Sequence, residues 1–295
     1  LLSVEPIVRE AGLSALSLQD NLTEVRYKSA KDVVTSADIS SEKIIVEGIS
    51  KLFPEHSIRT EEAGRIENDK PSLWTWVIDP LDGTVNFSRG LPLWGVSVAL
   101  LYDSKPILAL CYLPKLSEMF IAYQGGGCFL NGKRIFVSET SVMEQAIVSN
   151  GDFNVGDVEK IHNENLTNFS AEAKNCMRVK CLGSAVTEGS FLAAGHLDAF
   201  VMTMSYPWDI AGIALLVEEA GGKATRLDGN PLQFIDGEQA LFSNGILHEK
   251  FLEILISTED TEKKSRTINI IDKLSKLDND LKNSTKPAIL LKSVM

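Results

Sequence analysis

One stretch of the chain joins an apolar run to two closely spaced carboxylates, Trp76-Val77-Ile78-Asp79-Pro80-Leu81-Asp82-Gly83-Thr84-Val85-Asn86-Phe87. The run before Asp79 is dense in Trp, Val and Ile, which predicts a buried strand over residues 73–78 that ends in a loop. Pro80 fixes one backbone dihedral, and Gly83 permits a close approach of the backbone. An Asp-Gly hairpin turn with a capping aspartate is the plain alternative. Such a turn does not require the whole run, so we expect the strand to deliver Asp79 and Asp82 into a functional site.

These carboxylates belong to a set of acidic residues that is typical of metal binding. Asp79 and Asp82, beside the Thr84 hydroxyl, can bridge a pair of hard cations through oxygen ligands. Glu61 and Glu62 follow a predicted strand, so one of them could face the same cleft, although paired glutamates usually form a solvated face. Asp209 opens an apolar helix, where it can cap the helix and bind a metal at once. The acidic residues therefore predict a pocket for divalent cations.

A junction between strand and helix at Gly183-Ser184-Ala185 offers a second kind of site. Free N–H groups and the helix dipole at such a junction suit a phosphate, whereas an ordinary serine N-cap is the alternative. Carboxylates alone repel a phosphate, but two divalent cations reverse this repulsion, polarise the phosphoryl oxygens and lower the pKa of a bound water. The residues therefore predict metal-assisted hydrolysis of a phosphate ester, which is among the slowest uncatalysed reactions.

The pattern around the first stretch predicts a mixed α and β unit over residues 1–138. Apolar residues at helical spacing predict helices at 4–22 and from 36 to just before Pro54. Strands are predicted near residue 58 and at 73–78, 93–101, 107–113, 119–123, 128–130 and 135–137. We expect two helices packed on an antiparallel meander, which carries most of the metal ligands.

The second part, residues 139–257, alternates strands with helices and predicts a layered α/β unit with the last metal ligand and the phosphate-binding turn. Its strands are predicted at 146–149, 179–182 and 198–202, and its helices at 158–168, 184–194 and 209–220. The polar, lysine-rich tail at 258–295 is expected to be either helical, over 268–281, or disordered.

The composition of the 295-residue chain restricts its class. With 44% hydrophobic and 23% charged residues it fits a soluble globular protein, and its net charge of −11 argues against a nucleic-acid coat or a polybasic membrane binder. No window reaches the roughly 18 uninterrupted apolar residues of a membrane helix. The four cysteines form no CxxC pair, which favours buried reduced thiols, and the start has no signal-peptide pattern. We therefore expect a cytoplasmic protein, whose natural N-terminus could be missing because the first residue is Leu1.

Two segments resemble the two signatures of the inositol monophosphatase family: Asp79-Pro80-Leu81-Asp82-Gly83-Thr84-Val85-Asn86-Phe87, and Trp208-Asp209-Ile210-Ala211-Gly212 followed by Glu219-Ala220-Gly221-Gly222. The resemblance extends over about residues 4–255 and leaves the tail uncovered. It implies a fold of the α+β or α/β class, a layered αβαβα sandwich. It also implies a homodimer that needs two or three Mg²⁺ ions per site and is often inhibited by lithium.

By this resemblance, Glu61 binds the first magnesium, although Thr60 stands where the family has a glycine. The other implied metal ligands are Asp79 as a bridge, the backbone carbonyl of Leu81 for the first ion, and Asp82 and Asp209 for the second.

The resemblance also implies a catalytic group of residues and a substrate-binding surface. Thr84 and Glu61 position the attacking water, and Asp38, in Val34-Thr35-Ser36-Ala37-Asp38, hydrogen-bonds Thr84 and raises its basicity. Lys28 matches a lysine that reaches toward the site. The implied substrate contacts are Asp82, Gly83, Thr84, Gly183, Ser184, Ala185, Asp209 and Lys28.

One departure from the family pattern leaves the substrate open. Seven residues before Asp209, members that cleave inositol phosphates carry a glutamate that binds the sugar hydroxyls, and this chain has Met202. A thioether cannot accept those hydrogen bonds as a carboxylate does, although Met202 could simply be a strand residue that faces the core. The segment from Phe87 to Gly95, which includes Arg89, is similar to that of relatives that cleave histidinol phosphate.

We therefore predict a magnesium-dependent phosphomonoesterase whose partner is a small phosphorylated metabolite, a polyol or sugar phosphate, with no nucleic acid and no membrane. Histidinol phosphate, fructose 1,6-bisphosphate and 3′-phosphoadenosine 5′-phosphate are alternative substrates. A non-catalytic metal-binding regulatory protein is a further alternative, because fold does not imply function. Such a protein is expected to lose a metal ligand or the pair of Thr84 and Asp38, and the sequence keeps them all.

Overall fold

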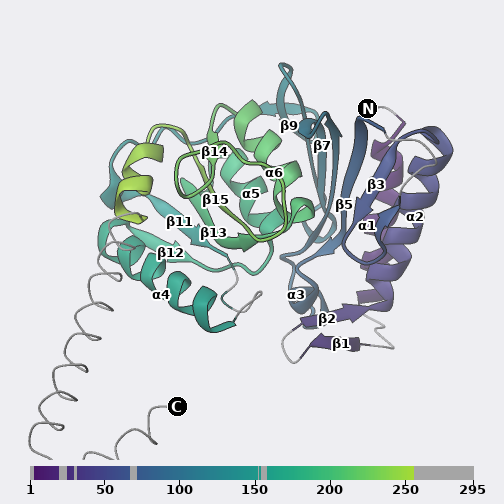
Figure 1. Cartoon of the computed structure of the whole chain (residues 1–295), viewed down its shortest axis with the longest axis horizontal. Coiled ribbons are helices and arrows are strands. Elements are labelled where there is room, and N and C mark those ends of the chain that lie inside the picture. Colours follow the sequence, from purple (N-terminus) through teal and green to yellow (C-terminus); the bar gives the residue numbers. More distant parts are fainter. Residues whose placement is uncertain are drawn as a thin grey trace, which may run out of the picture.

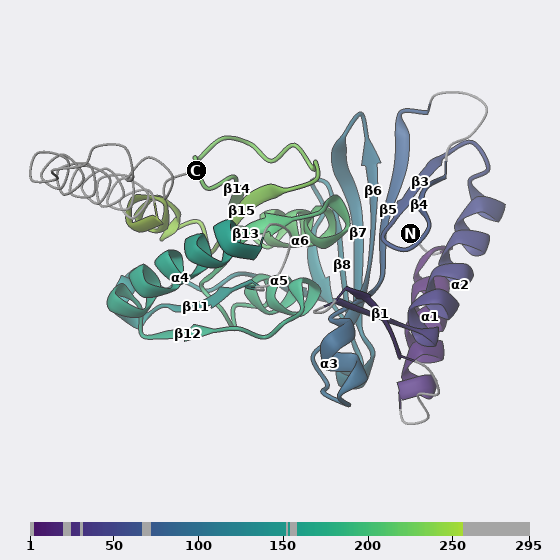
Figure 2. The same ribbon diagram turned by 60° about the horizontal axis from the view of Figure 1, so that its bottom comes forward.

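The computed structural model describes residues 3–19, 25–29, 32–66, 72–151, 153 and 158–255. Helices alternate with two β-sheets in layers, and the αβαβα sandwich that the resemblance implies is confirmed (Figures 1 and 2). No helix among the described residues is both long enough and apolar enough to span a membrane.

The first helical layer covers one face of the larger sheet (Figure 2). It consists of α1 (Glu5–Gln19) and α2 (Ser36–Leu52). Val8 and Ala11 of α1 and Ile45 and Ile49 of α2 are fully buried, three or four residues apart, which is the spacing of one face of a helix. They pack with Trp76 and other apolar side chains of the sheet.

The larger sheet has eight strands in the order β10-β9-β8-β7-β6-β5-β3-β4. Its strands are β3 (Ser57–Thr60), β4 (Gly64–Ile66), β5 (Trp74–Asp82), β6 (Gly95–Tyr102), β7 (Lys105–Leu113), β8 (Glu118–Tyr123), β9 (Gly127–Leu130) and β10 (Lys133–Ile135). A separate hairpin of β1 (Val25–Ser29) and β2 (Asp32–Thr35) precedes α2, and the short helix α3 (Thr84–Ser88) follows β5.

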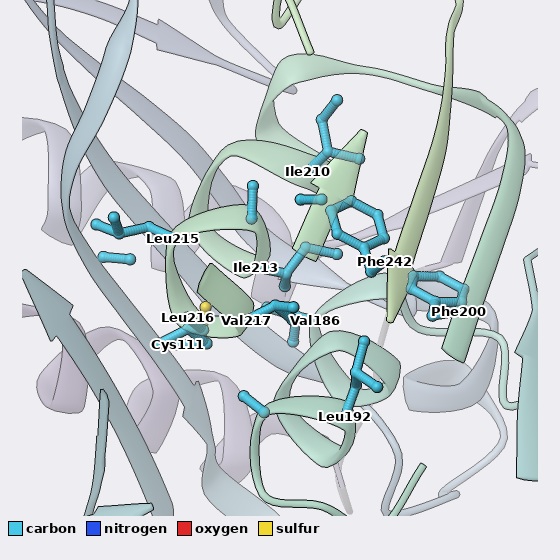
Figure 3. Close-up of a cluster of buried hydrophobic side chains, with 14 of the residues drawn as sticks. Cys111, Val186, Leu192, Phe200, Ile210, Ile213, Leu215, Leu216, Val217 and Phe242 are labelled. Atoms are coloured by element: carbon cyan, nitrogen blue, oxygen red, sulfur yellow. The ribbon is translucent and has the colours of Figure 1, made fainter. Parts of the chain in front are cut away.

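The middle layer consists of α5 (Ala185–Ala193) and α6 (Pro207–Glu219), which lie between the two sheets (Figure 2). Both helices are apolar on almost every side, because each face meets a sheet or the other helix. Figure 3 shows the resulting cluster of Cys111 from β7, Val186 and Leu192 from α5, Ile210, Ile213, Leu215, Leu216 and Val217 from α6, and Phe200 and Phe242 from the second sheet.

The second sheet has five strands in the order β12-β11-β13-β15-β14. These are β11 (Ile147–Asn150), β12 (Arg178–Lys180), β13 (Ala199–Ser205), β14 (Lys223–Thr225) and β15 (Glu238–Ser243). β11 runs parallel to β12 and β13, whereas β15 runs antiparallel to β13 and β14. The last helical layer, α4 (Val158–Asn175) and a helical segment at 248–255, covers the outer face (Figure 1).

Several predicted bounds differ from the structure. β5 does not end at residue 78 but continues to Asp82, because the chain keeps pairing with β6 across a register shift after Asp79. The antiparallel meander is interrupted, since β3 pairs in parallel with β5. α4 extends beyond 168 to Asn175, and β10 lies at 133–135 rather than 135–137. The expected helix at 268–281 and the end of the helix at 4–22 lie outside the described residues.

Candidate active site

The end of β5 carries three of the expected metal ligands. The ladder to β6 shifts register between Asp79 and Asp82, as in a β-bulge that re-aims side chains. Asp79 is buried, and its Oδ1 accepts a hydrogen bond from the Leu81 backbone N–H at 3.0 Å. Gly83 then adopts a φ of 84°, and a Cβ added to it would lie 3.0 Å from Cβ of Ser184. The turn therefore brings the strand end directly against the start of α5.

Asp82 lies at the N-terminus of α5. Its Oδ2 accepts a hydrogen bond from the Val186 N–H at 2.9 Å, its Oδ1 accepts one from the Ala185 N–H at 3.2 Å, and the Ser184 hydroxyl also donates to it. Burial raises the pKa of Asp82, although these hydrogen bonds act in the opposite direction. Ser184 is also the N-cap, because its Oγ accepts from the Thr187 N–H at 3.2 Å. The expected phosphate-binding junction thus lies at the site, but two of its helix N–H groups face a carboxylate.

Thr84 and Asp38 form the expected pair. The Thr84 hydroxyl lies 3.0 Å from Asp38 Oδ1 and 3.1 Å from the Leu81 carbonyl, so its single proton has two alternative acceptors. Asp38 Oδ2 accepts a hydrogen bond from the Thr35 N–H at 2.8 Å, as in a capping box at the start of α2. Burial raises the pKa of Asp38, and the charge of Glu62 adds to this effect, whereas the hydrogen bonds from Thr35 and Thr84 oppose it. Asp38 is therefore a fixed acceptor that holds the Thr84 hydroxyl.

Glu61 and Asp209 approach the end of β5 from different layers, the larger sheet and the middle helical layer. The Glu61 N–H donates to the Ile78 carbonyl at 3.2 Å, so Glu61 directly continues the pairing of β3 with β5. Asp209 lies in the first turn of α6, and its Oδ2 accepts a hydrogen bond from the Tyr206 N–H at 2.6 Å. This cap uses one of its two oxygens, which agrees with the double role that the sequence predicts for Asp209.

The charges of neighbouring carboxylates affect two of the acidic side chains, Asp79 and Asp209. Burial first, and then the charges of Glu61, Asp82 and Asp209, raise the pKa of Asp79 well above its ordinary value. Burial also raises the pKa of Asp209 well above its ordinary value, with smaller contributions from Asp82, Glu61 and Asp236. Like charges that are gathered away from water are unfavourable unless a cation or a proton compensates them.

The donor set fits a hard divalent cation. All the candidate ligands are oxygens, from the carboxylates of Glu61, Asp79, Asp82 and Asp209 and the carbonyl of Leu81, and Mg²⁺ prefers such ligands. In the part of the chain that the structure describes, however, no three acidic, His or Cys side chains converge to the spacing of a formed ligand sphere. Asp79, Asp82 and Asp209 each accept hydrogen bonds from backbone N–H groups, and each carboxylate keeps lone pairs that an ion could use.

Two other residues singled out in the sequence are placed differently. Lys28 belongs to β1, and its side chain lies outside what the structure describes. Met202 is 7% exposed on β13 and packs in the apolar cluster between the sheets. The interpretation of Met202 as a strand residue that faces the core is therefore correct.

Asn86 contributes to the site, although the sequence did not single it out. Its side-chain amide donates to the carbonyls of Leu93 and Leu182, both at 2.7 Å, and lies 3.3 Å from the carbonyl of Gly183. It therefore connects α3 with the turn that starts α5. Its presence in the first signature was the available signal, but its partner lies 96 residues away in the chain.

A model of the inositol monophosphatase family matches residues 5–259. The chain belongs to this family. A Thermotoga maritima fructose-1,6-bisphosphatase/inositol-1-monophosphatase is 34% identical over 228 residues, which are 76% of this chain and 83% of the relative. The Nus factor SuhB of Pseudomonas aeruginosa is 36% identical and covers 71% of this chain and 78% of its own length. The two names show that family members at similar identity have different roles.

Solved structures of family members share this fold, and one of them holds Mg²⁺. The Thermotoga maritima IMPase structure has a TM-score of 0.78 at 31% identity and covers 87% of this chain and 96% of its own. An IMPase/NADP phosphatase complexed with Mg²⁺ and phosphate has a TM-score of 0.71 at 25% identity, with 81% and 88% covered. A Staphylococcal inositol monophosphatase-1 forms an inhibitory complex with lithium, with a TM-score of 0.70 at 26% identity and 81% and 87% covered.

Proposed function

We propose that the chain is a magnesium-dependent phosphomonoesterase that acts on a small polyol or sugar phosphate. The observation that supports this most is the gathering of carboxylates around the end of β5, where burial and then the charges of Glu61, Asp82 and Asp209 raise the pKa of Asp79. The hydroxyl of Thr84, held by Asp38, lies beside them. A buried acidic site of this kind suits a phosphate only together with cations.

When bound by Glu61, Asp79, Asp82, Asp209 and the carbonyl of Leu81, Mg²⁺ would supply a Lewis acid that polarises a phosphoryl group and lowers the pKa of water.

The chain's own residues account for orientation at the site. When the Thr84 hydroxyl donates to Asp38 rather than to the Leu81 carbonyl, its oxygen keeps lone pairs that can accept a hydrogen bond from an attacking water and orient it. Asp38 is held in turn by the Thr35 N–H, so the hydroxyl is fixed before substrate arrives. Asp82 is held by the N-terminus of α5, which fixes the strand end relative to the substrate-binding turn.

Met202 guides the choice of substrate within this class. A side chain that is 7% exposed and apolar cannot bind sugar hydroxyls as a carboxylate does. We therefore infer that Met202 does not bind the hydroxyl groups of inositol 1-phosphate. Fructose 1,6-bisphosphate, which occurs in the name of the Thermotoga maritima relative, is an alternative substrate, together with histidinol phosphate and 3′-phosphoadenosine 5′-phosphate.

The test is release of phosphate from a panel of these monoesters, with Mg²⁺ and after EDTA treatment. We expect hydrolysis only with Mg²⁺, and a ranking of substrates by kcat/KM. Asp82→Asn, which keeps the shape of the side chain but halves its acceptor capacity, is expected to lower kcat/KM by about 100-fold or more. Glu249→Gln, an exposed change at the helical segment 248–255, is the control that should keep full activity.

Two outcomes would contradict the proposal. Hydrolysis that survives EDTA, or Asp82→Asn at the wild-type rate, would exclude this mechanism. Tight Mg²⁺ binding without turnover of any ester would instead favour the non-catalytic regulatory alternative.

We also propose that the protein is a cytoplasmic homodimer. Cys111 and Cys128 are buried thiols, as expected for a reducing compartment, whereas Cys176 is half-buried and Cys181 is exposed, so the expectation of buried thiols is correct for two of the four cysteines. Light scattering after size-exclusion chromatography tests the dimer, and fluorescence microscopy of the tagged full-length protein tests the compartment.

A further inference from the structure

Arg59 joins the segments that carry Glu61 and Asp209. It lies on β3, two residues before Glu61, and its guanidinium forms an ion pair with Asp236, in the segment between β14 and β15. The same guanidinium lies over the ring of Trp208, 5.4 Å from the ring centroid. Arg59 therefore connects the larger sheet with two segments of the second half of the molecule.

On the second half, these contacts lead directly to Asp209. The Trp208 ring stacks on Tyr206, with centroids 5.0 Å apart and planes 8° apart. The backbone N–H of Tyr206 is the group that caps Asp209, at 2.6 Å. Asp236 belongs to a segment that is tied to the same region, because the Gly237 N–H donates to the Ser205 carbonyl at 3.0 Å.

On the larger sheet, the turn after β3 is fixed from the other side. Glu42 of α2 accepts hydrogen bonds from the Thr60 hydroxyl at 2.6 Å and from the Ala63 N–H at 3.0 Å. Glu61 lies between these two anchored residues. A side chain that ties β3 to Trp208 therefore limits how far Glu61 and Asp209 can move apart.

We propose that Arg59, paired with Asp236 and stacked on Trp208, is a positioning residue that sets the separation of Glu61 and Asp209 and thereby the affinity of the site for magnesium. This inference rests on the function proposed above. The planar guanidinium is essential because it pairs with a carboxylate and stacks on an aromatic face at once, which an ammonium group cannot do. A partly exposed ion pair contributes little to stability, so its effect should be on the metal site and not on folding.

The experiment compares wild type with Arg59→Met, Arg59→Lys and Asp236→Asn. Calorimetric titration with Mg²⁺ alone gives the dissociation constant, and the Mg²⁺ dependence of phosphate release gives kcat and KM. We expect Mg²⁺ to bind Arg59→Met about 10-fold more weakly, as for residues that orient metal ligands. Arg59→Lys should fall between the two, and the kcat at saturating Mg²⁺ and the urea midpoint should stay near wild type. Lys223→Met, which breaks the exposed pair with Glu249, is the matched control and should bind Mg²⁺ as wild type does.

Wild-type Mg²⁺ affinity in both Arg59→Met and Asp236→Asn would overturn the inference while leaving the proposed function intact. If Arg59→Met fails to fold, Arg59→Lys and Asp236→Asn decide by the same criterion. A wild-type protein that neither binds Mg²⁺ nor releases phosphate would overturn the proposed function, and this inference with it.

Discussion

At the scale of single residues, close approach of the backbone decides the geometry of the site. Gly83 and Gly90 both have positive φ, 84° and 74°, which L-residues rarely adopt. A Cβ on Gly83 would also lie 3.1 Å from the Leu93 carbonyl and 3.0 Å from Ser184 Cβ, whereas nothing lies within 4 Å of a Cβ on Gly90. Substitutions at the two glycines therefore distinguish the effect of conformational strain, present at both, from the effect of close packing, present only at Gly83.

Gly83→Ala is expected to lower both stability and activity, and Gly90→Ala only stability. The strain of a left-handed alanine costs about 1–2 kcal/mol at each position. At Gly83 the contact with Ser184 should add to this and displace Asp82, so that kcat/KM falls about 10-fold or more. Urea unfolding and phosphate release measure the two effects. Equal activity of the two variants would show that the close approach at Gly83 is unimportant.

Glu172 is a buried acid outside the site. Both of its carboxylate oxygens accept hydrogen bonds from the Asn150 side-chain amide at 3.1 Å, and the side chain is fully buried on α4. Burial raises the pKa of Glu172 from its ordinary value of 4.5 to about 7, although the bond from Asn150 acts in the opposite direction. The folded protein therefore holds a proton at this position over a range of pH where the unfolded chain does not.

Because the folded pKa is raised, Glu172 destabilises the folded state as the pH rises from about 4.5 through about 7. The loss reaches about 3 kcal/mol when the group is fully ionised. Urea unfolding between pH 4.5 and 8 measures how the free energy of unfolding changes with pH in wild type and in Glu172→Gln. The decrease caused by ionisation of Glu172 should be absent from the variant. Glu159→Gln, an exposed change on the same helix, should keep the wild-type slope. Parallel curves for wild type and Glu172→Gln would contradict the prediction.

At the scale of elements, α6 fixes different parts of the molecule at its two ends. Its first turn holds Asp209 through the Tyr206 N–H. At its last residue, the carboxylate of Glu219 accepts hydrogen bonds from the N–H groups of Gly125 at 2.6 Å and Gly127 at 2.7 Å. The helix thus ties the turn between β8 and β9 to the layer that carries Asp209, an expected metal ligand.

Removal of this contact should destabilise the fold without affecting catalysis. Hydrogen bonds to charged groups contribute about 1.5–3 kcal/mol each when buried, so we expect Glu219→Ala to lose about 2 kcal/mol at this partly exposed turn. The neighbouring Glu218→Ala, whose side chain is exposed, is the matched control and should change stability by less than about 0.5 kcal/mol. Urea unfolding gives both values, and kcat per folded molecule should stay at wild type. Similar losses of stability in the two variants would indicate that the hydrogen bonds from Gly125 and Gly127 to Glu219 do not contribute to stability.

At the scale of the whole molecule, the candidate site lies where the larger sheet meets the middle helical layer. Glu61 and Asp79 come from the larger sheet and Asp209 from α6, and small residues allow this approach. A Cβ on Gly212 of α6 would lie 2.7 Å from Ser97 Oγ of β6, and one on Gly95 would lie 2.6 Å from Val186 of α5. The candidate site is therefore a property of the packed interface between the larger sheet and the middle helical layer.

Because these carboxylates repel one another, Mg²⁺ should stabilise the whole fold. A ligand that binds only the folded state at about 100 times its dissociation constant adds about 2.7 kcal/mol. In EDTA, Asp79→Asn should unfold at a higher temperature than wild type, because the substitution removes one buried charge from the group of carboxylates. Added Mg²⁺ should raise the unfolding midpoint of this variant less than that of wild type. Thermal unfolding with EDTA and with Mg²⁺ measures both. A wild-type midpoint that is insensitive to Mg²⁺, or an Asp79→Asn midpoint below wild type in EDTA, would contradict this account.

The sequence by itself determined the features that depend on neighbouring residues. The apolar run before Asp79, the turn at Gly83 and the capping positions of Asp38 and Asp209 are local, and the motifs that contain them indicated the family. The predicted end of β5 at residue 78 was wrong, because pairing with β6 continues across a register shift to Asp82. A strand's own sequence does not show which strand it pairs with.

Only the tertiary structure decided which distant groups meet. It directed two N–H groups of α5 to Asp82, joined Asn86 to Leu182, and paired Arg59 with Asp236, 177 residues away. Such contacts depend on how the two sheets pack around α5 and α6, because a side chain's own neighbours do not specify what another layer places opposite it. The local sequence therefore determines which ligand groups are present, whereas the packing of the layers determines how they are arranged.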